Sequence, residues 1–283
     1  GNNVTHAVTI RPRSWALVAC SLILIALSVR AALYELTEAL EGISSSDAWL
    51  AVGASTLSAV VGLVFFAWAA RLKPTALSWL AAFGWGTGGA LIFAGYGNTV
   101  IDSAVAASNL SDDAVDVVTS VVTGPLVEET GKGVGVLVLI LAARKLLTRP
   151  AQGGVLGALV GLGFAWGEDV GYYVSALEDG MSGLWESFLA RALLGAYGHA
   201  IFTGVFGYAL AWAVLRAQNV LVGLLAAAGG FVAALALHAQ ANGIGFLAPE
   251  DSWNLTYGAI EIPVLVVSVA LLVWGLRRHR STL

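Results

Sequence analysis

Residues 220–241, VLVGLLAAAGGFVAALALHAQA, contain no Asp, Glu, Lys or Arg. A helix needs about 20 consecutive, mostly apolar residues to cross the hydrocarbon core of a bilayer, so this stretch predicts a transmembrane helix. Similar stretches recur at approximately 15–33, 48–70, 75–96, 125–143, 153–174, 188–215 and 257–276. The sequence therefore predicts an all-α, polytopic integral membrane protein, a helical bundle with about eight transmembrane helices.

The composition argues against a soluble protein. Hydrophobic residues make up 58% of the chain and charged residues only 11%, whereas soluble domains carry about 25% charged residues. The basic residues form no patch suited to nucleic acid, and the single Cys20 can form no internal disulfide. We interpret residues 15–33 as a retained helix, because this stretch is long for a signal peptide and lacks a clear small-x-small cleavage site. We expect a multi-pass protein of the cell membrane, with the lipid bilayer as its surroundings.

Charges between the predicted spans alternate in sign along the chain. The N-terminal arm, every second connection and the C-terminal tail are basic, and the remaining connections are acidic. The basic residues are Arg11, Arg13, Arg71, Lys73, Arg144, Lys145, Arg149, Arg216, Arg277, Arg278 and Arg280. Because Lys and Arg are enriched in cytoplasmic loops, this alternation predicts that both termini lie in the cytoplasm.

Small residues recur at four-residue spacing in the fifth predicted span. Gly153, Gly157 and Gly161 form one such ridge. In lipid, ridges of small residues let helix backbones approach closely. The ridge predicts that this span lies in the middle of the bundle.

Few ionisable residues lie inside the predicted spans. A charged group at the centre of a membrane helix costs about 2.5–3.5 kcal/mol on insertion scales, so we expect these side chains to point into the bundle. We expect Arg30 and Arg191 instead to reach water at the outer edge, and we assign no role to Asp169 or Glu261. The others are Glu128, Glu129, Lys132, Glu168, His199 and His238.

Four of these residues are predicted to lie at one depth. Glu128, Glu168, His199 and His238 are each 16 to 19 residues from the basic end of their span. At 1.5 Å per residue this corresponds to roughly 24–29 Å, in a hydrocarbon core about 30 Å thick. Four helices thus bring polar groups to the same plane, which predicts a single site near the extracytoplasmic face.

The spacing around the two glutamates adds local detail. Lys132 is within helical reach of either Glu128 or Glu129. Gly124-Pro125 favours a helix start, which would place both glutamates near a helix N-terminus. We expect residues 115–123 to lie along the outer interface before this start.

At these residues the sequence resembles the PrsW family of intramembrane proteases, within the wider superfamily of CAAX prenyl endopeptidases. The superfamily signature is a Glu-Glu pair with a basic residue one turn on, then Phe-x-x-x-His and His-x-x-x-Asn. The matching segments are EETGK at 128–132, FAWGE at 164–168, a histidine of PrsW-like proteins at His199, and HAQAN at 238–242. Glu168 stands where the CAAX enzymes have His, as in the PrsW form.

The resemblance implies peptide hydrolysis within the membrane by a glutamate-activated water. It also implies site-1 cleavage of a single-pass membrane protein, such as a membrane-bound anti-sigma factor. The resemblance covers residues 125–242. Together with the predicted spans, it leads us to expect a single membrane domain, 1–283, with three N-terminal helices in 15–96, a four-helix catalytic core in 125–242 and a C-terminal helix in 257–276. The implied catalytic residues are Glu128, Glu129, Glu168, His199, His238 and Asn242, supported by Lys132.

We expect Glu128 to activate the water and Glu129 to pair with Lys132. Glu168 would share the water or protonate the leaving amine, and His238 with Asn242, one helical turn apart, would stabilise the oxyanion. His199 would orient a carboxylate or bind a metal.

No cofactor is favoured at this stage, because the sequence has no His-Glu-x-x-His motif and the candidate ligands come from three helices. Zinc is the alternative, since two His and one Glu form a known catalytic set. Two other functions stay open. Intramembrane Glu and His also build the proton relays of transporters, and a non-catalytic scaffold would resemble the Aph component of gamma-secretase.

Overall fold

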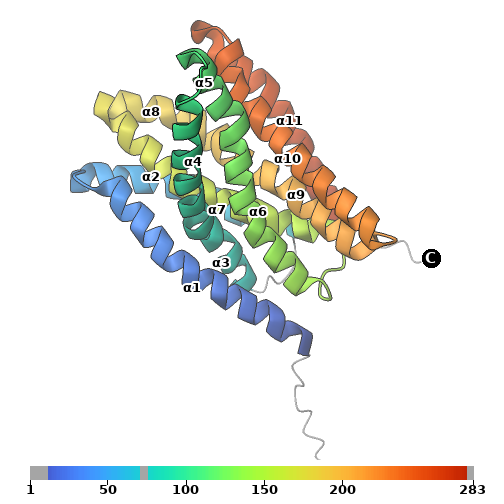
Figure 1. Ribbon diagram of the computed structural model, residues 1–283. Coiled ribbons are helices and arrows are strands. Elements are labelled where there is room, and N and C mark those ends of the chain that lie inside the picture. Colours follow the sequence, from blue (N-terminus) through green and yellow to red (C-terminus); the bar gives the residue numbers. More distant parts are fainter. Residues whose placement is uncertain (1–11, 71–75, 279–283) are drawn as a thin grey trace, which may run out of the picture.

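The computed structural model describes residues 12–70 and 76–278, which form helices and no strand. The long helices pack as a bundle, with α7 in its interior (Figure 1). The α-helices are α1 (Pro12–Leu40), α2 (Ser45–Ala70), α3 (Ala76–Trp85), α4 (Leu91–Ala106), α5 (Asp112–Val117), α6 (Gly124–Ala143), α7 (Pro150–Ala176), α8 (Gly180–Ala190), α9 (Ala196–Arg216), α10 (Val220–Leu247) and α11 (Trp253–Arg277). The π-helical turns are η1 (Gly86–Ala90), η2 (Val118–Thr123) and η4 (Arg191–Gly195), and the 3₁₀ turns are η3 (Leu177–Asp179) and η5 (Glu250–Ser252).

Six helical segments of the described chain are long and apolar enough to cross a membrane. These are Trp15–Leu40, Ser45–Ala70, Ala76–Ala106, Tyr197–Arg216, Val220–Leu247 and Glu250–Arg277. The prediction of a polytopic helical membrane protein is confirmed. The two remaining predicted spans correspond to α6 and α7, which carry the glutamates. Because much of α6 and most of α7 is buried among other helices, these two helices need fewer apolar residues than a helix that faces lipid.

The glycine ridge of α7 packs directly on α9. A Cβ atom added to Gly157 would lie 2.3 Å from the carbonyl oxygen of Thr203, and one added to Gly161 would lie 2.1 Å from that of His199. Only glycine permits this approach of two backbones. The predicted central position of the fifth span is confirmed, since nearly every residue from Pro150 to Ala165 is buried.

We expect Gly161→Ala to destabilise the protein by about 1–3 kcal/mol, the usual cost of overpacking. The matched control is Gly171→Ala in the same helix, where an added Cβ meets no atom within 4 Å. Both substitutions gain the same intrinsic helix propensity, up to about 1 kcal/mol. The difference between the stabilities of the two variants therefore measures the clash of the added methyl group with α9. Thermal unfolding of both variants in the same detergent measures it. Equal stabilities would contradict the packing described for Gly161.

The segment expected along the outer interface is part of one long helix with α6. α5, η2 and α6 form one continuous helix, because the dihedral angles at Val117 (φ −63°, ψ −48°) and Thr123 (φ −76°, ψ −38°) are helical. The N–H of Gly124 donates to the carbonyl oxygen of Thr119, five residues earlier. This wider π turn accommodates Pro125, which has no N–H of its own. The expected helix start at Pro125 is therefore wrong, and the glutamates do not lie at a helix N-terminus.

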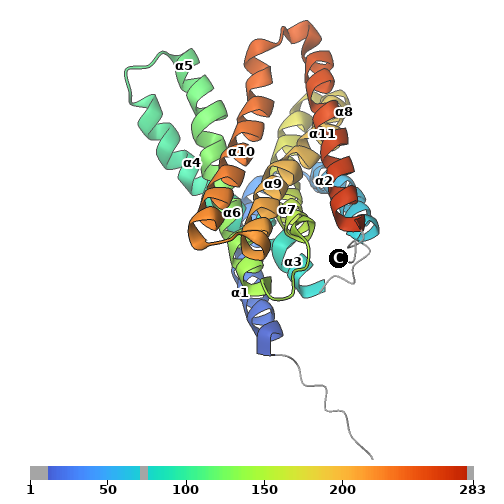
Figure 2. The same cartoon turned by 90° about the vertical axis from the view of Figure 1, so that its right-hand side faces the viewer.

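Helices on the site side also extend further than predicted. α4 continues to Ala106, α10 continues to Leu247, and α11 starts at Trp253. Figure 2 shows α4 and α5 as a hairpin at one edge of the bundle, with α10 and α11 as a second long hairpin. These extensions form the upper walls of the pocket described next.

Candidate active site

A pocket of about 520 Å³ lies where these two hairpins meet α7 and α9. Its walls come from α4, η2 with α6, α7, η4 with α9, α10 and α11. The four helices expected to contribute polar groups all do so. Glu128, Glu168, His199 and His238 line the pocket, and so does Asn242.

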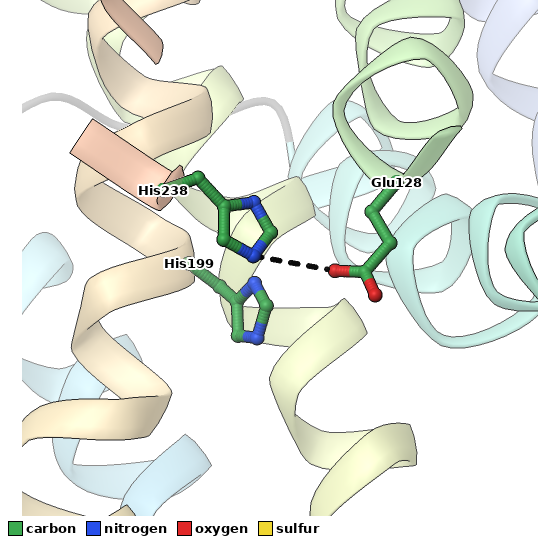
Figure 3. Close-up of side chains that lie close together, drawn as sticks. All are labelled: Glu128, His199 and His238. Carbon is green, nitrogen blue, oxygen red and sulfur yellow. Dashed lines mark ion pairs between the residues drawn. The ribbon is translucent and has the colours of Figure 1, made fainter. Parts of the chain in front are cut away.

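Three of these side chains converge from three different helices. Glu128 on α6, His199 on α9 and His238 on α10 each offer one ligand atom, and these atoms lie within 4.8 Å of one another. Figure 3 shows the carboxylate of Glu128 facing the two imidazoles, with His238 Nε2 lying 3.5 Å from Glu128 Oε2. The two imidazole rings are nearly perpendicular, with centroids 5.2 Å apart.

Glu129 lies behind the pocket wall and has only 2% of its surface exposed. Its Oε1 accepts hydrogen bonds from Lys132 Nζ (2.8 Å) and His238 Nδ1 (2.9 Å), and its Oε2 accepts one from Thr203 Oγ1 (2.9 Å). The structure thus pairs Lys132 with Glu129, one of the two partners that helical spacing allowed. Because His238 Nδ1 carries the proton given to Glu129, its Nε2 presents a lone pair to Glu128. Imidazoles that bind metals are commonly oriented in this way, by a carboxylate that accepts the proton of the other ring nitrogen.

His199 makes hydrogen bonds through both ring nitrogens. Lys132 Nζ lies 2.7 Å from Nδ1, and Glu168 Oε2 lies 2.9 Å from Nε2. Since an ammonium group can only donate, Nδ1 accepts and Nε2–H donates to Glu168. The imidazole packs against the rings of Phe164 and Phe202, with centroids 5.2 and 5.9 Å away. His199 therefore orients the Glu168 carboxylate, one of the two roles expected for it.

Arg191 does not extend to water as expected. Its side chain is 23% exposed, and its Nε and Nη2 groups donate to Asp169 Oδ1 (2.5 Å) and Glu168 Oε2 (3.1 Å). Asp169 is almost fully buried, so it needs this partner to offset the cost of burying its charge. Arg191 and Asp169 are separated by 22 residues, and local spacing rules within one helix give no signal for such a pair.

Thr203 was likewise not identified from the sequence, although it lies one helical turn after His199.

Asn242 lies one turn after His238, as expected, and its Nδ2 donates to the carbonyl oxygen of Ser120 in η2 at 2.9 Å. This bond connects α10 to the π turn above Glu128. The oxyanion role expected for His238 and Asn242 stays a prediction.

Two other polar residues of the spans lie outside the pocket wall. Glu261 on α11 is 5% exposed, and its Oε1 atom has no hydrogen-bond partner among the described residues. Arg30 is exposed on α1. Neither of them is among the residues that line the pocket.

The donor set of the pocket fits a zinc ion. Two His and one Glu are a known catalytic zinc set, His238 Nε2 offers a lone pair, and Glu128 Oε2 is buried without a hydrogen-bond partner among the described residues. His199 would have to release one of its present partners to bind a metal. Glu128, His199 and His238 are the residues that could hold a metal ion here.

The formal charges at the site do not balance within the network. Four carboxylates lie within this network and only two cations, and buried charges require compensation. The carboxylates are those of Glu128, Glu129, Glu168 and Asp169, and the cations are Lys132 and Arg191. A divalent cation would balance the two unmatched negative charges, as would two protons.

The chain was compared with known proteins. Neither the curated proteins nor the solved structures gave a match. A protein-family model, the PrsW family intramembrane metalloprotease, matches residues 73–274. The matched region covers more than half of the chain and contains every residue of the site described above. The chain therefore belongs to the PrsW family of intramembrane metalloproteases, multi-pass membrane proteins that cleave within the bilayer.

Proposed function

We propose that this protein is an endopeptidase that cleaves a single-pass membrane protein near the extracytoplasmic face, with Glu128, His199 and His238 as zinc ligands and Glu168 as general base. The observation that carries this proposal is the convergence of three ligand atoms within 4.8 Å in a polar pocket. The family match supports peptide hydrolysis over the transporter and the scaffold that the sequence left open.

In this proposal each residue of the site has a separate role in the hydrolysis. Glu168, held by Arg191, accepts a proton from the water that attacks the scissile carbonyl carbon. It then delivers that proton to the leaving nitrogen. Glu129 keeps the Nε2 lone pair of His238 directed at the pocket. A zinc ion bound there would supply Lewis-acid chemistry, which polarises a carbonyl and makes water more acidic.

A metal-free mechanism is the second candidate, and a specific observation favours it. Both nitrogens of His199 are engaged by protein partners, so this histidine is ready to orient Glu168 without a metal. In that case Glu128 itself takes the proton from water, as the sequence analysis expected. Its Oε2 atom accepts no hydrogen bond from the described residues and so has a lone pair for that proton.

The substrate class is argued from the position of the pocket. Glu128 lies near the start of α6 and Arg144 directly follows its end, and similar basic residues mark the same end of α9 and α11. If that end is cytoplasmic, the pocket opens near the outer face. A single-pass protein cleaved there would undergo site-1 proteolysis, as proposed for an anti-sigma-like substrate.

The cleavage assay uses the purified full chain in nanodiscs, together with a panel of dual-tagged single-pass membrane proteins of the same membrane. We expect at least one panel member to be cut in or next to its outer membrane boundary, as mapped by mass spectrometry of both fragments. If all cuts lay at the cytoplasmic boundary, the proposed orientation would be wrong. If the panel stayed intact, the peptidase proposal would be lost.

Metal analysis separates the two mechanisms. We expect purified wild type to carry about one zinc ion per chain, a stoichiometry typical of three-ligand catalytic sites. His238→Gln should lower the zinc content at least about tenfold, and Glu261→Gln, a buried carboxyl outside the pocket, should leave it unchanged. Elemental analysis of the gel-filtered proteins measures this. Full cleavage activity in a zinc-free preparation would establish the metal-free route instead.

A further inference from the structure

The guanidinium group of Arg191 is fixed on three sides. Its Nε and Nη2 donate to Asp169 and Glu168, and its Cζ lies 3.6 Å from the centre of the Tyr172 ring. The π turn η4, which begins at Arg191, places this side chain at the pocket wall. Because the guanidinium is planar, these contacts also fix the direction of its remaining N–H groups. Nη1 makes no hydrogen bond to any residue in the described part of the chain.

Several other donors at or near the pocket are already committed. Lys132 is fully buried and gives its protons to Glu129 and His199. His238 donates through Nδ1 to Glu129, so it faces the pocket with a lone pair. Asn242 uses an amide hydrogen on Ser120. Among the described residues that line the pocket, Arg191 is the only Lys or Arg.

Arg191 also lies next to the residues that would handle the water. Its Nη2 and His199 Nε2 contact the same oxygen, Glu168 Oε2, at 3.1 and 2.9 Å. A carbonyl carbon attacked by a water beside Glu168 therefore has its oxygen close to the guanidinium edge. Donors held in place for a developing negative charge are among the largest contributions to enzymatic rates.

We propose that Arg191 is a catalytic residue that binds the carbonyl oxygen of the scissile peptide bond through Nη1. This role rests on the proposed hydrolytic function. The water oxygen attacks the carbonyl carbon, the carbonyl π electrons move to its oxygen, and Glu168 takes the water proton. The negative oxygen lies against the guanidinium until the C–N bond breaks and the leaving nitrogen accepts the proton. Asp169 acts as a positioning residue that holds the guanidinium in place.

The test compares variants on the panel member that wild type cleaves fastest. Arg191→Gln should lower kcat by about 10²–10³-fold, the range found for loss of one oxyanion donor, and should change KM by less than about threefold. Arg191→Lys retains the positive charge but lacks the planar array of N–H donors of a guanidinium group. Its kcat should therefore lie between those of Arg191→Gln and wild type. The control Arg30→Gln, exposed on α1 and away from the pocket, should match wild type.

A second variant distinguishes catalysis from folding. Arg191→Gln leaves both Asp169 and Glu168 without this cation, whereas Arg191→Gln combined with Asp169→Asn also removes the charge of the almost fully buried Asp169. We expect the double variant to regain the thermal stability and zinc content of wild type while kcat stays about 10²-fold low. Recovery of kcat to within threefold of wild type would overturn the proposal and leave Arg191 a structural role only. If wild type cleaves no panel member, both the peptidase function and the proposed role of Arg191 are rejected. If Arg191→Gln is active while Glu168→Gln is inactive, only the proposed role of Arg191 is rejected.

Discussion

Glu128→Gln is expected to reduce kcat/KM for the cleaved panel member by at least about 10³-fold, the upper part of the range for a lost catalytic acid–base group. This loss of activity is expected from both the zinc-dependent and the metal-free mechanism. Gln keeps the shape of the side chain but is a poor metal ligand, and it cannot accept a proton from water. The measurement is the rate of fragment formation in nanodiscs by quantitative gel analysis.

The matched control is Glu261→Gln, which changes a buried carboxyl on α11 that does not line the pocket. It should cleave within about twofold of wild type, since surface and core changes remote from a site leave its geometry intact. An active Glu128→Gln variant would remove Glu128 from the chemistry, whichever metal state the protein adopts. Loss of activity in both variants would instead indicate that buried carboxyls of the bundle are needed for folding.

Lys132→Met should destabilise the protein by about 3–5 kcal/mol, the usual cost of removing one partner from a buried ion pair. Lys132 is fully buried, and its ammonium group contacts Glu129 at 2.8 Å, His199 at 2.7 Å and the face of the Phe164 ring at 4.3 Å. Methionine fills a similar volume and leaves the Glu129 carboxylate without its cation. Thermal unfolding in detergent, followed by light scattering and tryptophan fluorescence, measures the effect.

The double variant Lys132→Met with Glu129→Gln is the control for charge. It removes both members of the pair, so most of the lost stability should return, because a buried pair can often be replaced by neutral groups at little cost. His238 would then lose its carboxylate partner, and such outer partners are worth about 10–100-fold in metal affinity or activity. If the double variant were as unstable as Lys132→Met, the contribution of Lys132 to stability would not come from its ion pair with Glu129.

The helical geometry of α6 directs the side chains of the two glutamates to different surroundings. Adjacent residues in a helix point about 100° apart, so Glu128 and Glu129 cannot both face the pocket. The structure directs Glu128 to the pocket and Glu129 to the buried network of Lys132, Thr203 and His238. One carboxylate thus remains available to water or metal, and the other positions an imidazole.

Much of the architecture was predictable from the sequence alone. Apolar stretches of membrane length predicted the helices, and the glycines of 153–161 predicted a central position for α7, which the structure shows packed closely on α9. Counting residues from the basic ends predicted that Glu128, Glu168 and His238 would lie at one level. These inferences succeed because hydrophobic length and helix rise are properties of a single segment.

The partners across helices were decided only by the tertiary structure. The pairing of Arg191 with Asp169, the bond from Thr203 to Glu129 and the π turn before Pro125 depend on how each helix is rotated and packed against its neighbours. Spacing rules within one helix cannot specify that rotation, because it results from side-chain packing over many helices at once. The sequence by itself predicted that Glu128, Glu168, His199 and His238 belong to one site. The packed bundle determined which of them face the pocket and brought Arg191 and Thr203 to hold the others in place.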